Sequence, residues 1–211
     1  MLLFPKFVFK VKTEKKIIAL TFDDGPHPEF TEELLDIFKE KNVKATFFVT
    51  GTNIESQKHL ILRMINEGHE LGNHSYSHKN LIFRSPGKIR DEILKTDKLL
   101  RELGVKGAIH FRPPFGRILL SACFVMQSLK KKVIMWNIPT KDFKEPYPEV
   151  IISRIYNRLK PGSIIVLHDS GLSRNGKNID RKATIAAVKE IVQELPKRGY
   201  QFKTISELIN N

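Results

Sequence analysis

Short runs of β-branched and aromatic residues recur along the chain, separated by longer stretches in which apolar residues follow a helical spacing. The short runs predict strands, at Ile17–Phe22, Ala45–Val49, His69–Gly72, Ile109–Arg112, Val133–Trp136, Ser163–Leu167 and Gln201–Thr204. The amphipathic stretches predict helices at Pro28–Lys41, Ile54–Glu67, Pro86–Leu103, Leu119–Leu129, Tyr147–Leu159 and Arg181–Arg198, the last disturbed at Pro196.

Alternation of strands and helices predicts a parallel sheet with helices on its outside. Seven such units without a break in composition predict a single α/β domain, a distorted or incomplete (β/α) barrel of about seven strands that is TIM-like. The 211 residues suit one domain with a full core and are too few for two ordinary ones. Residues 1–14 form an N-terminal extension or a short strand that enters the barrel.

The opening segment does not read as a secretory signal, because Pro5 and Lys6 interrupt its apolar residues. It can be a short strand leading into the barrel, the stub of a removed anchor, or a weak interfacial segment; we favour the strand. No apolar run approaches the roughly 18 residues of a membrane span. Cys123 is the single cysteine, so no internal disulfide or cysteine zinc site is expected.

The net charge of +13 favours anionic partners. The basic residues are scattered and mixed with acids, however, as on a solvated helix surface, and only Lys130–Lys132 form a local cluster. We therefore expect no nucleic-acid binding. A peripheral contact with an anionic envelope or membrane stays open, and a monomer is favoured.

Ionisable residues follow the predicted strands at the points where those strands end. Asp23 and Asp24 follow the first strand, and the pair His74 and His78 follows the third. Further along the chain the same positions hold Arg112, Asp142 and His168. Because the carboxyl ends of the strands of a parallel barrel share one face, these groups are predicted to converge on one active site.

One carboxylate and two imidazoles form a ligand set that leaves coordination positions open for water and substrate. Asp24 with His74 and His78 supplies that set, and Asp23 is then free to act as a base on the water. Taken singly, the aspartates could simply cap a turn at Gly25-Pro26, and a pair of histidines four apart is common by chance. If the turn at 74–78 is helical, both imidazoles lie on one face.

A stiff loop, Arg112-Pro113-Pro114-Phe115-Gly116, follows the fourth predicted strand. It can aim Arg112 at a carboxylate and present the Phe115 amide to a developing oxyanion. His168 ends an apolar strand and becomes a candidate general acid if it lies near a metal. Asp142 matters only if it reaches His168 and holds that ring protonated.

Together these motifs make the chain resemble the polysaccharide deacetylases of carbohydrate esterase family four, the NodB-type domain, over residues 15–211. Five family motifs occur in order, at Thr21–Pro26, His74–His78, Arg112–Gly116, Trp136–Phe143 and Val166–Asp169. The resemblance implies a distorted barrel and a divalent metal, usually zinc or cobalt.

The resemblance also implies roles for individual residues. Asp23 would be the general base, oriented by Arg112. The metal ligands would be Asp24, His74 and His78. His168 would be the acid, tuned by Asp142, and the Phe115 amide would stabilise the oxyanion. Substrate would contact Pro113, Phe115, Phe143 and Val166. The last two depart from the tryptophan and leucine that are frequent in the family and would line the pocket for the acetyl methyl group.

The expected activity is removal of N-acetyl groups from an N-acetylglucosamine glycan, such as peptidoglycan, a chitin-like oligomer or an exopolysaccharide. Four alternatives stay open: a deformylase of lipid-linked amino sugars, an O-acetyl esterase on xylan, a catalytically silent glycan-binding domain, and a facial-triad iron oxygenase. The resemblance favours a cell-envelope or secreted location, with a cytoplasmic one not excluded.

Overall fold

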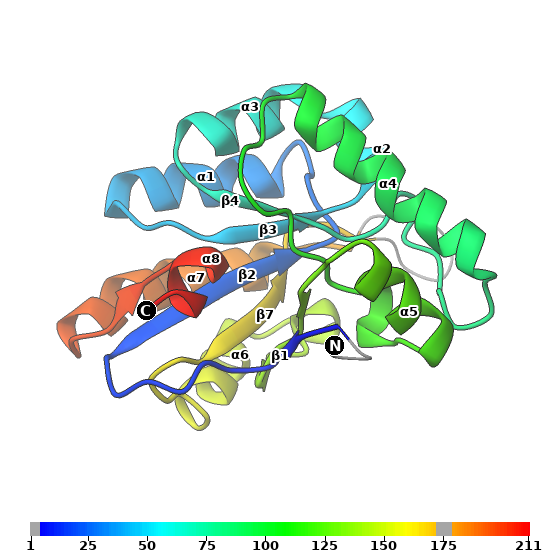
Figure 1. Ribbon diagram of the computed structural model, residues 1–211. Coiled ribbons are helices and arrows are strands. Elements are labelled where there is room, and N and C mark those ends of the chain that lie inside the picture. Colours follow the sequence, from blue (N-terminus) through cyan, green and yellow to red (C-terminus); the bar gives the residue numbers. More distant parts are fainter. Residues whose placement is uncertain (1–4, 172–178) are drawn as a thin grey trace.

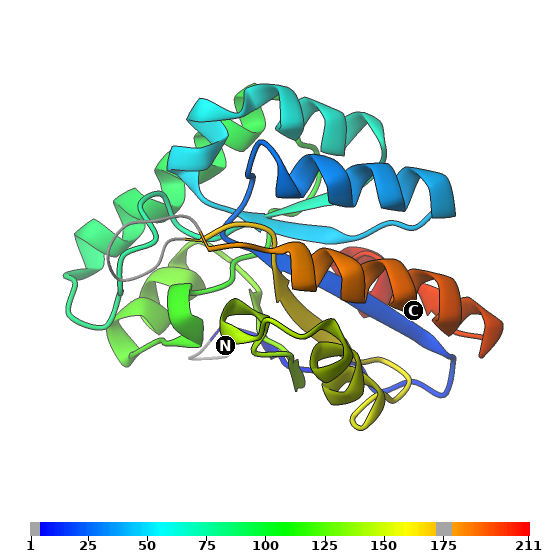
Figure 2. The same cartoon turned by 180° about the vertical axis from the view of Figure 1, so that it is seen from behind.

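The computed structural model describes residues 5–171 and 179–211, which form a curved sheet with helices around its outer surface (Figures 1 and 2). The central strand is β2 (Ile17–Asp23). On one side of it lie β3 (Thr46–Val49) and then β4 (Glu70–Asn73), and on the other β7 (Ile164–His168) and then β6 (Ile138–Pro139). The short β8 (Gln201–Phe202) pairs with the start of β2, and every one of these pairings is parallel.

A second, two-stranded sheet extends this arrangement towards a barrel. It consists of β1 (Phe7–Val8) and β5 (Val133–Ile134), which pair in parallel. Phe111 forms isolated bridges to Asn73 at the end of β4 and to Val133 in β5. Lys10 bridges Ser163 just before β7. The strands therefore follow a distorted, incompletely hydrogen-bonded barrel, as predicted.

Eight α-helices are present in the described residues. They are α1 (Phe30–Lys41), α2 (Gly51–Ser56), α3 (Lys58–Asn66), α4 (Pro86–Glu102), α5 (Leu120–Ser128), α6 (Pro148–Tyr156), α7 (Lys182–Lys197) and α8 (Ile205–Ile209). Two single 3-10 turns, η1 (Pro114–Gly116) and η2 (Asp142–Lys144), follow the strand ends. No helix in the part that the structure describes is both long and apolar enough to cross a membrane.

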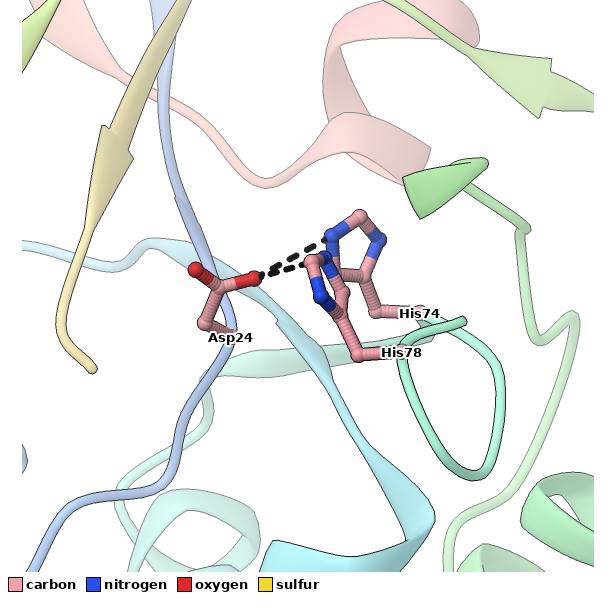
Figure 3. A group of neighbouring side chains, drawn as sticks. All are labelled: Asp24, His74 and His78. Carbon is pink, nitrogen blue, oxygen red and sulfur yellow. Dashed lines mark ion pairs between the residues drawn. The ribbon is translucent and has the colours of Figure 1, made fainter. Parts of the chain in front are cut away.

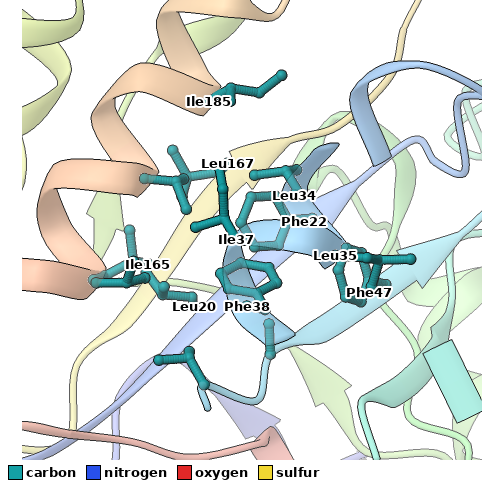
Figure 4. Close-up of a cluster of buried hydrophobic side chains, with 14 of the residues drawn as sticks. Leu20, Phe22, Leu34, Leu35, Ile37, Phe38, Phe47, Ile165, Leu167 and Ile185 are labelled. Carbon is teal, nitrogen blue, oxygen red and sulfur yellow. The ribbon is translucent and has the colours of Figure 1, made fainter. Parts of the chain in front are cut away.

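The strand β2 is buried on both faces, and its alternation separates two cores. Leu20 and Phe22 point outward into the main cluster beneath the helices, where they pack with α1 and α7 (Figure 4). Ala19 points inward to a smaller cluster that also holds Phe48 and, from α8, Ile205. Because inward positions recur every second residue, Thr21 and Asp23 also face the barrel interior.

Several predicted elements were wrong in detail. The predicted strand Ile109–Arg112 reduces to the single bridging residue Phe111, because Pro113 and Pro114 follow at once and cannot donate to a ladder. The predicted helix Ile54–Glu67 is two helices, since Gln57 adopts φ −130° and ψ 44°. The predictions missed β6 and α8, whereas α7 does continue through Pro196.

Candidate active site

The adjacent carboxylates Asp23 and Asp24 face different directions at the end of β2. Asp23 is the last residue of the strand, faces the interior and is 3% exposed. Asp24 has a φ of 78°, in the left-handed region, which ends the extended strand and turns this side chain to the rim instead of the outer face of the sheet. The strand end therefore delivers one carboxylate to the barrel interior and the other to the rim.

Asp23 receives a charged hydrogen bond from Arg112, whose Nη1 lies 2.7 Å from Asp23 Oδ1. The same Nη1 donates to Thr21 Oγ1 at 2.8 Å. Nε and Nη2 of Arg112 donate to the carbonyls of Ile134 at 3.0 Å and Met135 at 3.1 Å. Burial lowers the pKa of the Arg112 guanidinium, and the Asp23 carboxylate opposes that shift. A fully buried cation with all three nitrogens engaged fixes the position of the Asp23 carboxylate.

Asp24, His74 and His78 bring three ligand atoms within 4.8 Å of one another (Figure 3). Oδ1 of Asp24 lies 3.4 Å from His74 Nε2 and 3.1 Å from His78 Nε2. Burial alone would raise the pKa of Asp24, but the imidazoles of His74, His168 and His78 outweigh it and hold this pKa well below its usual range. Burial, reinforced by His74, lowers the pKa of His78 to about 4.

Backbone geometry, not a helix, brings the two histidines together. The residues after β4 form an irregular turn in which Ser75 and His78 have φ values of 68° and 50°. This turn is held by the carboxylate of Glu92 on α4, which accepts hydrogen bonds from the Tyr76 and Ser77 amides at 3.0 and 2.7 Å and from Ser77 Oγ at 2.7 Å. The turn at 74–78 is therefore not helical, but its irregular geometry still brings the two imidazoles together.

A backbone carbonyl on the far side of the ring from Asp24 sets the orientation of His74. Its Nδ1 lies 2.8 Å from the carbonyl oxygen of Arg112, which can only accept, so Nδ1 carries the proton and donates it. Nε2 is then left with a lone pair directed at Asp24. Oδ1 of Asp24 is buried and has no hydrogen-bond donor among the described residues. A buried carboxylate oxygen facing two imidazole nitrogens fits a divalent cation bound between them.

His168 and Asp142 form a second charged pair across the cavity. Asp142 Oδ1 lies 2.8 Å from His168 Nδ1, and Asp142 Oδ2 accepts from the backbone amide of His168 at 2.8 Å. Thr140 and Thr184 each donate a further hydrogen bond to Asp142, both at 3.0 Å. Burial would lower the pKa of His168, but the carboxylate of Asp142 outweighs it and raises this pKa to about 9. The ring is thus a protonated imidazolium at neutral pH.

The loop after Arg112 places Phe115 at the mouth of the site. Phe115 adopts φ 60° and ψ 9°, and its ring packs on that of His78 with centroids 4.7 Å apart. Gly116 also has a positive φ, and a Cβ there would lie 2.5 Å from Trp136. Phe143 packs edge-on against His168.

A cavity of about 980 Å³ unites these groups. Of the site residues predicted from sequence, it is lined by Asp23, Asp24, His74, His78, Phe115, Phe143, Val166 and His168. Arg112, Pro113 and Asp142 are buried and lie outside its lining. Arg112 and Asp142 can still act from outside the cavity, through Asp23 and His168, which they contact. Pro113 does not line the cavity, so its contact with substrate stays a prediction.

No role was assigned from the sequence to two further buried residues near the candidate metal ligands, Asp169 and Arg181. Asp169 accepts a hydrogen bond from Thr31 at 2.5 Å, and burial raises the pKa of Asp169 to about 7. Arg181, at the start of α7, donates from Nε to the Ser170 carbonyl at 2.9 Å and lines the cavity. Thr21 and Glu92 were also missed. Only Thr21 had a signal in the sequence, since it lies two residues before Asp23 and so on the same strand face.

Comparisons with known proteins point to one family. The sequence profile described as "Polysaccharide deacetylase" matches residues 10–134. A peptidoglycan-N-acetylglucosamine deacetylase of Bacillus cereus is 35% identical over 203 residues, which are 95% of this chain and 92% of the relative. A chitooligosaccharide deacetylase of Bradyrhizobium is 31% identical, covering 90% of each chain. Among solved structures, the chain is similar to the Bc1960 peptidoglycan N-acetylglucosamine deacetylase, crystallised with an N-hydroxybenzamide. The two superpose with a TM-score of 0.89 at 32% identity, and the match covers 97% of this chain and 93% of that one.

Proposed function

Because this chain belongs to the polysaccharide deacetylase family, we propose that it is a metal-dependent hydrolase that removes N-acetyl groups from N-acetylglucosamine-containing glycans. The proposal rests on the different surroundings of the two aspartates at the end of β2. Asp24 lies with His74 and His78, whereas Asp23 is held apart by Arg112. One carboxylate is thus available as a ligand and its neighbour as a base.

Asp24, His74 and His78 would hold the divalent cation, and two imidazoles with one carboxylate suit zinc, with cobalt as an alternative. When bound there, such a cation supplies Lewis-acid polarisation of the acetyl carbonyl and makes a water molecule more acidic. The chain prepares the ligands for this: the Arg112 carbonyl fixes the tautomer of His74, and the lowered pKa keeps His78 neutral.

Asp23 is the base in this mechanism. Its Oδ1 is occupied by Arg112, while its Oδ2 lies 3.9 Å from His74 Nε2, on the side of the ligand set. The ion pair with Arg112 holds the carboxylate in place while it takes a proton from the attacking water. That water adds to the acetyl carbonyl carbon, and the developing oxyanion lies near the Phe115 backbone N–H, which can donate to it.

His168 is the acid on the other side of the cavity. Breaking the C–N bond requires a proton on the amine nitrogen, since an unprotonated amine is a poor leaving group. Nδ1 of His168 donates to Asp142, so Nε2 carries the proton that can be transferred. The products are acetate and the free amino sugar. Phe143 and Val166, which line the same cavity, would enclose the acetyl methyl group.

The relatives and the shape of the site both support this substrate class. The relatives named above act on peptidoglycan and on chitooligosaccharides, two glycans that share N-acetylglucosamine. An open cavity of about 980 Å³ is at the upper end of the range for small-molecule sites and can admit more than one sugar ring. Peptidoglycan is the substrate to test first.

Acetate release tests the proposal directly. Chelator-treated protein would be assayed on peptidoglycan, N-acetylglucosamine oligomers and acetylated xylan, before and after zinc or cobalt is restored. We expect metal-dependent acetate from one of the N-acetylated glycans and its loss in Asp23→Asn, with zinc binding retained in that variant. Acetate from xylan alone would indicate an O-acetyl esterase. Zinc binding without acetate from any substrate would contradict N-deacetylation and direct the search to N-formyl sugars.

A further inference from the structure

The lining of the active-site cavity carries more positive than negative charge. Among the described residues that line it, Asp23 and Asp24 are the only acids. Asp23 forms an ion pair with Arg112, which lies outside the lining, and Asp24 would face the divalent cation of the proposed function. Each of these carboxylates is thus balanced by a cation of its own. Four lysine and arginine side chains line the same cavity: Lys79, Arg117, Lys141 and Arg181.

Three of the four cations are exposed and come from different loops. Lys79 lies in the loop between β4 and α4, Arg117 follows the turn η1, and Lys141 immediately precedes η2. None of the three forms an ion pair or a side-chain hydrogen bond within the described part of the chain. Residues 1–4 and 172–178 contain no aspartate or glutamate, so no acidic side chain outside the described residues can pair with them. Their charges are therefore available to a ligand in the cavity.

The fourth cation, Arg181, is buried in the cavity wall without an ion-pair partner among the described residues. Its side chain is 1% exposed, and both Nε and Nη2 donate to the Ser170 carbonyl, whereas Nη1 is buried and has no hydrogen-bond partner there. Burial raises the pKa of Asp169 to about 7 despite the charge of Arg181, so this carboxyl balances the guanidinium only in part at neutral pH. Asp142 interacts with the same charge but is already paired with His168. A buried guanidinium that is incompletely balanced favours an anion in the cavity beside it.

We propose that the cavity selects N-acetylated glycans that carry anionic groups, carboxylate or phosphate, and that Lys79, Arg117 and Lys141 determine this preference. The inference rests on the proposed function and adds to it a requirement on the charge of the substrate. Cations that line a cleft with low-dielectric walls attract an anion more strongly than the same charges on an open surface. Carboxylates and phosphates are the groups that lysine and arginine bind most strongly.

The preference is tested on three polymers that share one N-acetylated backbone: neutral glycol chitin, carboxymethyl chitin and phosphorylated chitin. Acetate release by the zinc-restored protein gives kcat/KM on each polymer. At about 0.05 M NaCl we expect kcat/KM to be at least about tenfold higher on an anionic polymer than on glycol chitin. At about 0.5 M NaCl this ratio should fall towards one, because salt screens the attraction. The better of the two anionic polymers identifies the group that the cavity prefers.

The variant Lys79→Gln/Arg117→Gln/Lys141→Gln tests whether the lining residues cause the preference. It removes the three exposed cations and keeps polar side chains in their place. Each exposed ion pair contributes roughly twofold to fivefold to binding, so the anionic-to-neutral ratio of kcat/KM should fall by about tenfold or more.

The whole chain is basic, with a net charge of +13, so the control must remove the same charge elsewhere. Lys39→Gln/Lys106→Gln/Lys189→Gln does this at exposed residues outside the cavity lining and should keep the wild-type ratio. Equal kcat/KM on the three polymers, or the same fall of the ratio in both triple variants, would overturn the proposal.

Failure of the proposed function has a different signature, namely the absence of acetate from every polymer. Equilibrium binding of zinc-loaded Asp23→Asn then decides the charge preference without turnover. Tighter binding of carboxymethyl or phosphorylated chitin than of glycol chitin would support charge selection, and equal binding of all three would refute it.

Discussion

The charged pair between His168 and Asp142 makes a quantitative prediction about the alkaline limit of activity. The pKa of His168 is raised to about 9, although burial acts to lower it, because Asp142 lies against the ring. In Asp142→Asn the largest of the charges that raise this pKa is removed while the burial stays, and a bound cation would offset the smaller contributions of Asp24 and Asp23. The pKa should then fall to its ordinary value of 6.5 or below.

The sign of the effect follows from which form is needed. A general acid acts when protonated, so activity is present below the pKa of His168 and is lost as the pH rises through it. At pH 8 a pKa of about 9 leaves roughly 90% of the ring protonated, and a pKa of 6.5 leaves roughly 3%. The variant should therefore lose roughly thirtyfold more activity at pH 8 than at pH 5.5. The stabilising effect of the ion pair on folding has the same direction: it is complete below pH 6.5 and is lost through about pH 9.

The assay is kcat for acetate release from pH 5 to 10, with the same metal at saturation in every protein. Thr184→Val is the matched control, because it removes a 3.0 Å hydrogen bond to Asp142 but no charge. Its alkaline limit should move by less than about 0.5 pH unit. A uniform loss of activity in Asp142→Asn at every pH, with an unshifted alkaline limit, would show that Asp142 only positions the ring and would refute the electrostatic reasoning.

Three further outcomes are expected. Arg112→Leu leaves the buried carboxylate of Asp23 without its cation and should cost about 3–5 kcal/mol of unfolding free energy in urea titrations. A loss below about 1 kcal/mol would contradict a stabilising role of this buried pair. Glu92→Gln weakens the hydrogen bonds that fix the turn carrying His78, so calorimetry should show about 10–100-fold weaker zinc binding. Glu102 is exposed on the same helix, and Glu102→Gln should bind zinc like wild type. Gly116→Ala forces a Cβ to within 2.5 Å of Trp136 and should lower the unfolding free energy by about 1–3 kcal/mol; unchanged thermal stability would show that the loop adjusts freely.

The convergence of the site could be predicted because it depends on a local signal repeated several times. Strand patterns such as Ile17–Phe22 are strong, and the ends of parallel strands meet at one edge of a barrel. Asp23 and His168 end neighbouring strands in register, with Asp23 opposite His168. Neither fact requires knowledge of loop conformation, so the sequence was sufficient to group these residues.

The features that could not be predicted depend on contacts between distant segments. β6 is two residues long, and Phe111 bridges two strands without belonging to one, so neither leaves a periodic pattern. Glu92 reads as one more acid on a solvated helix, yet it accepts hydrogen bonds from the turn between the two candidate histidine ligands. Arg181 reads as an ordinary surface cation before α7, but it is 1% exposed. Their roles follow from where the chain places α4 and α7.

Two neighbouring aspartates acquire different chemistry through one backbone angle. In an extended strand, consecutive side chains point to opposite faces, which would send Asp24 towards the helices and away from His74. The φ of 78° at Asp24 ends the strand and swings its carboxylate to the rim instead, within 3.4 Å of His74 Nε2. Asp23, still on the strand, keeps the inward direction that the barrel gives it and meets Arg112. On the proposed function, the strand end separates a metal ligand from a base without any spacing between them in the sequence. Asp24→Ala should then abolish cation binding while leaving the Asp23–Arg112 pair intact.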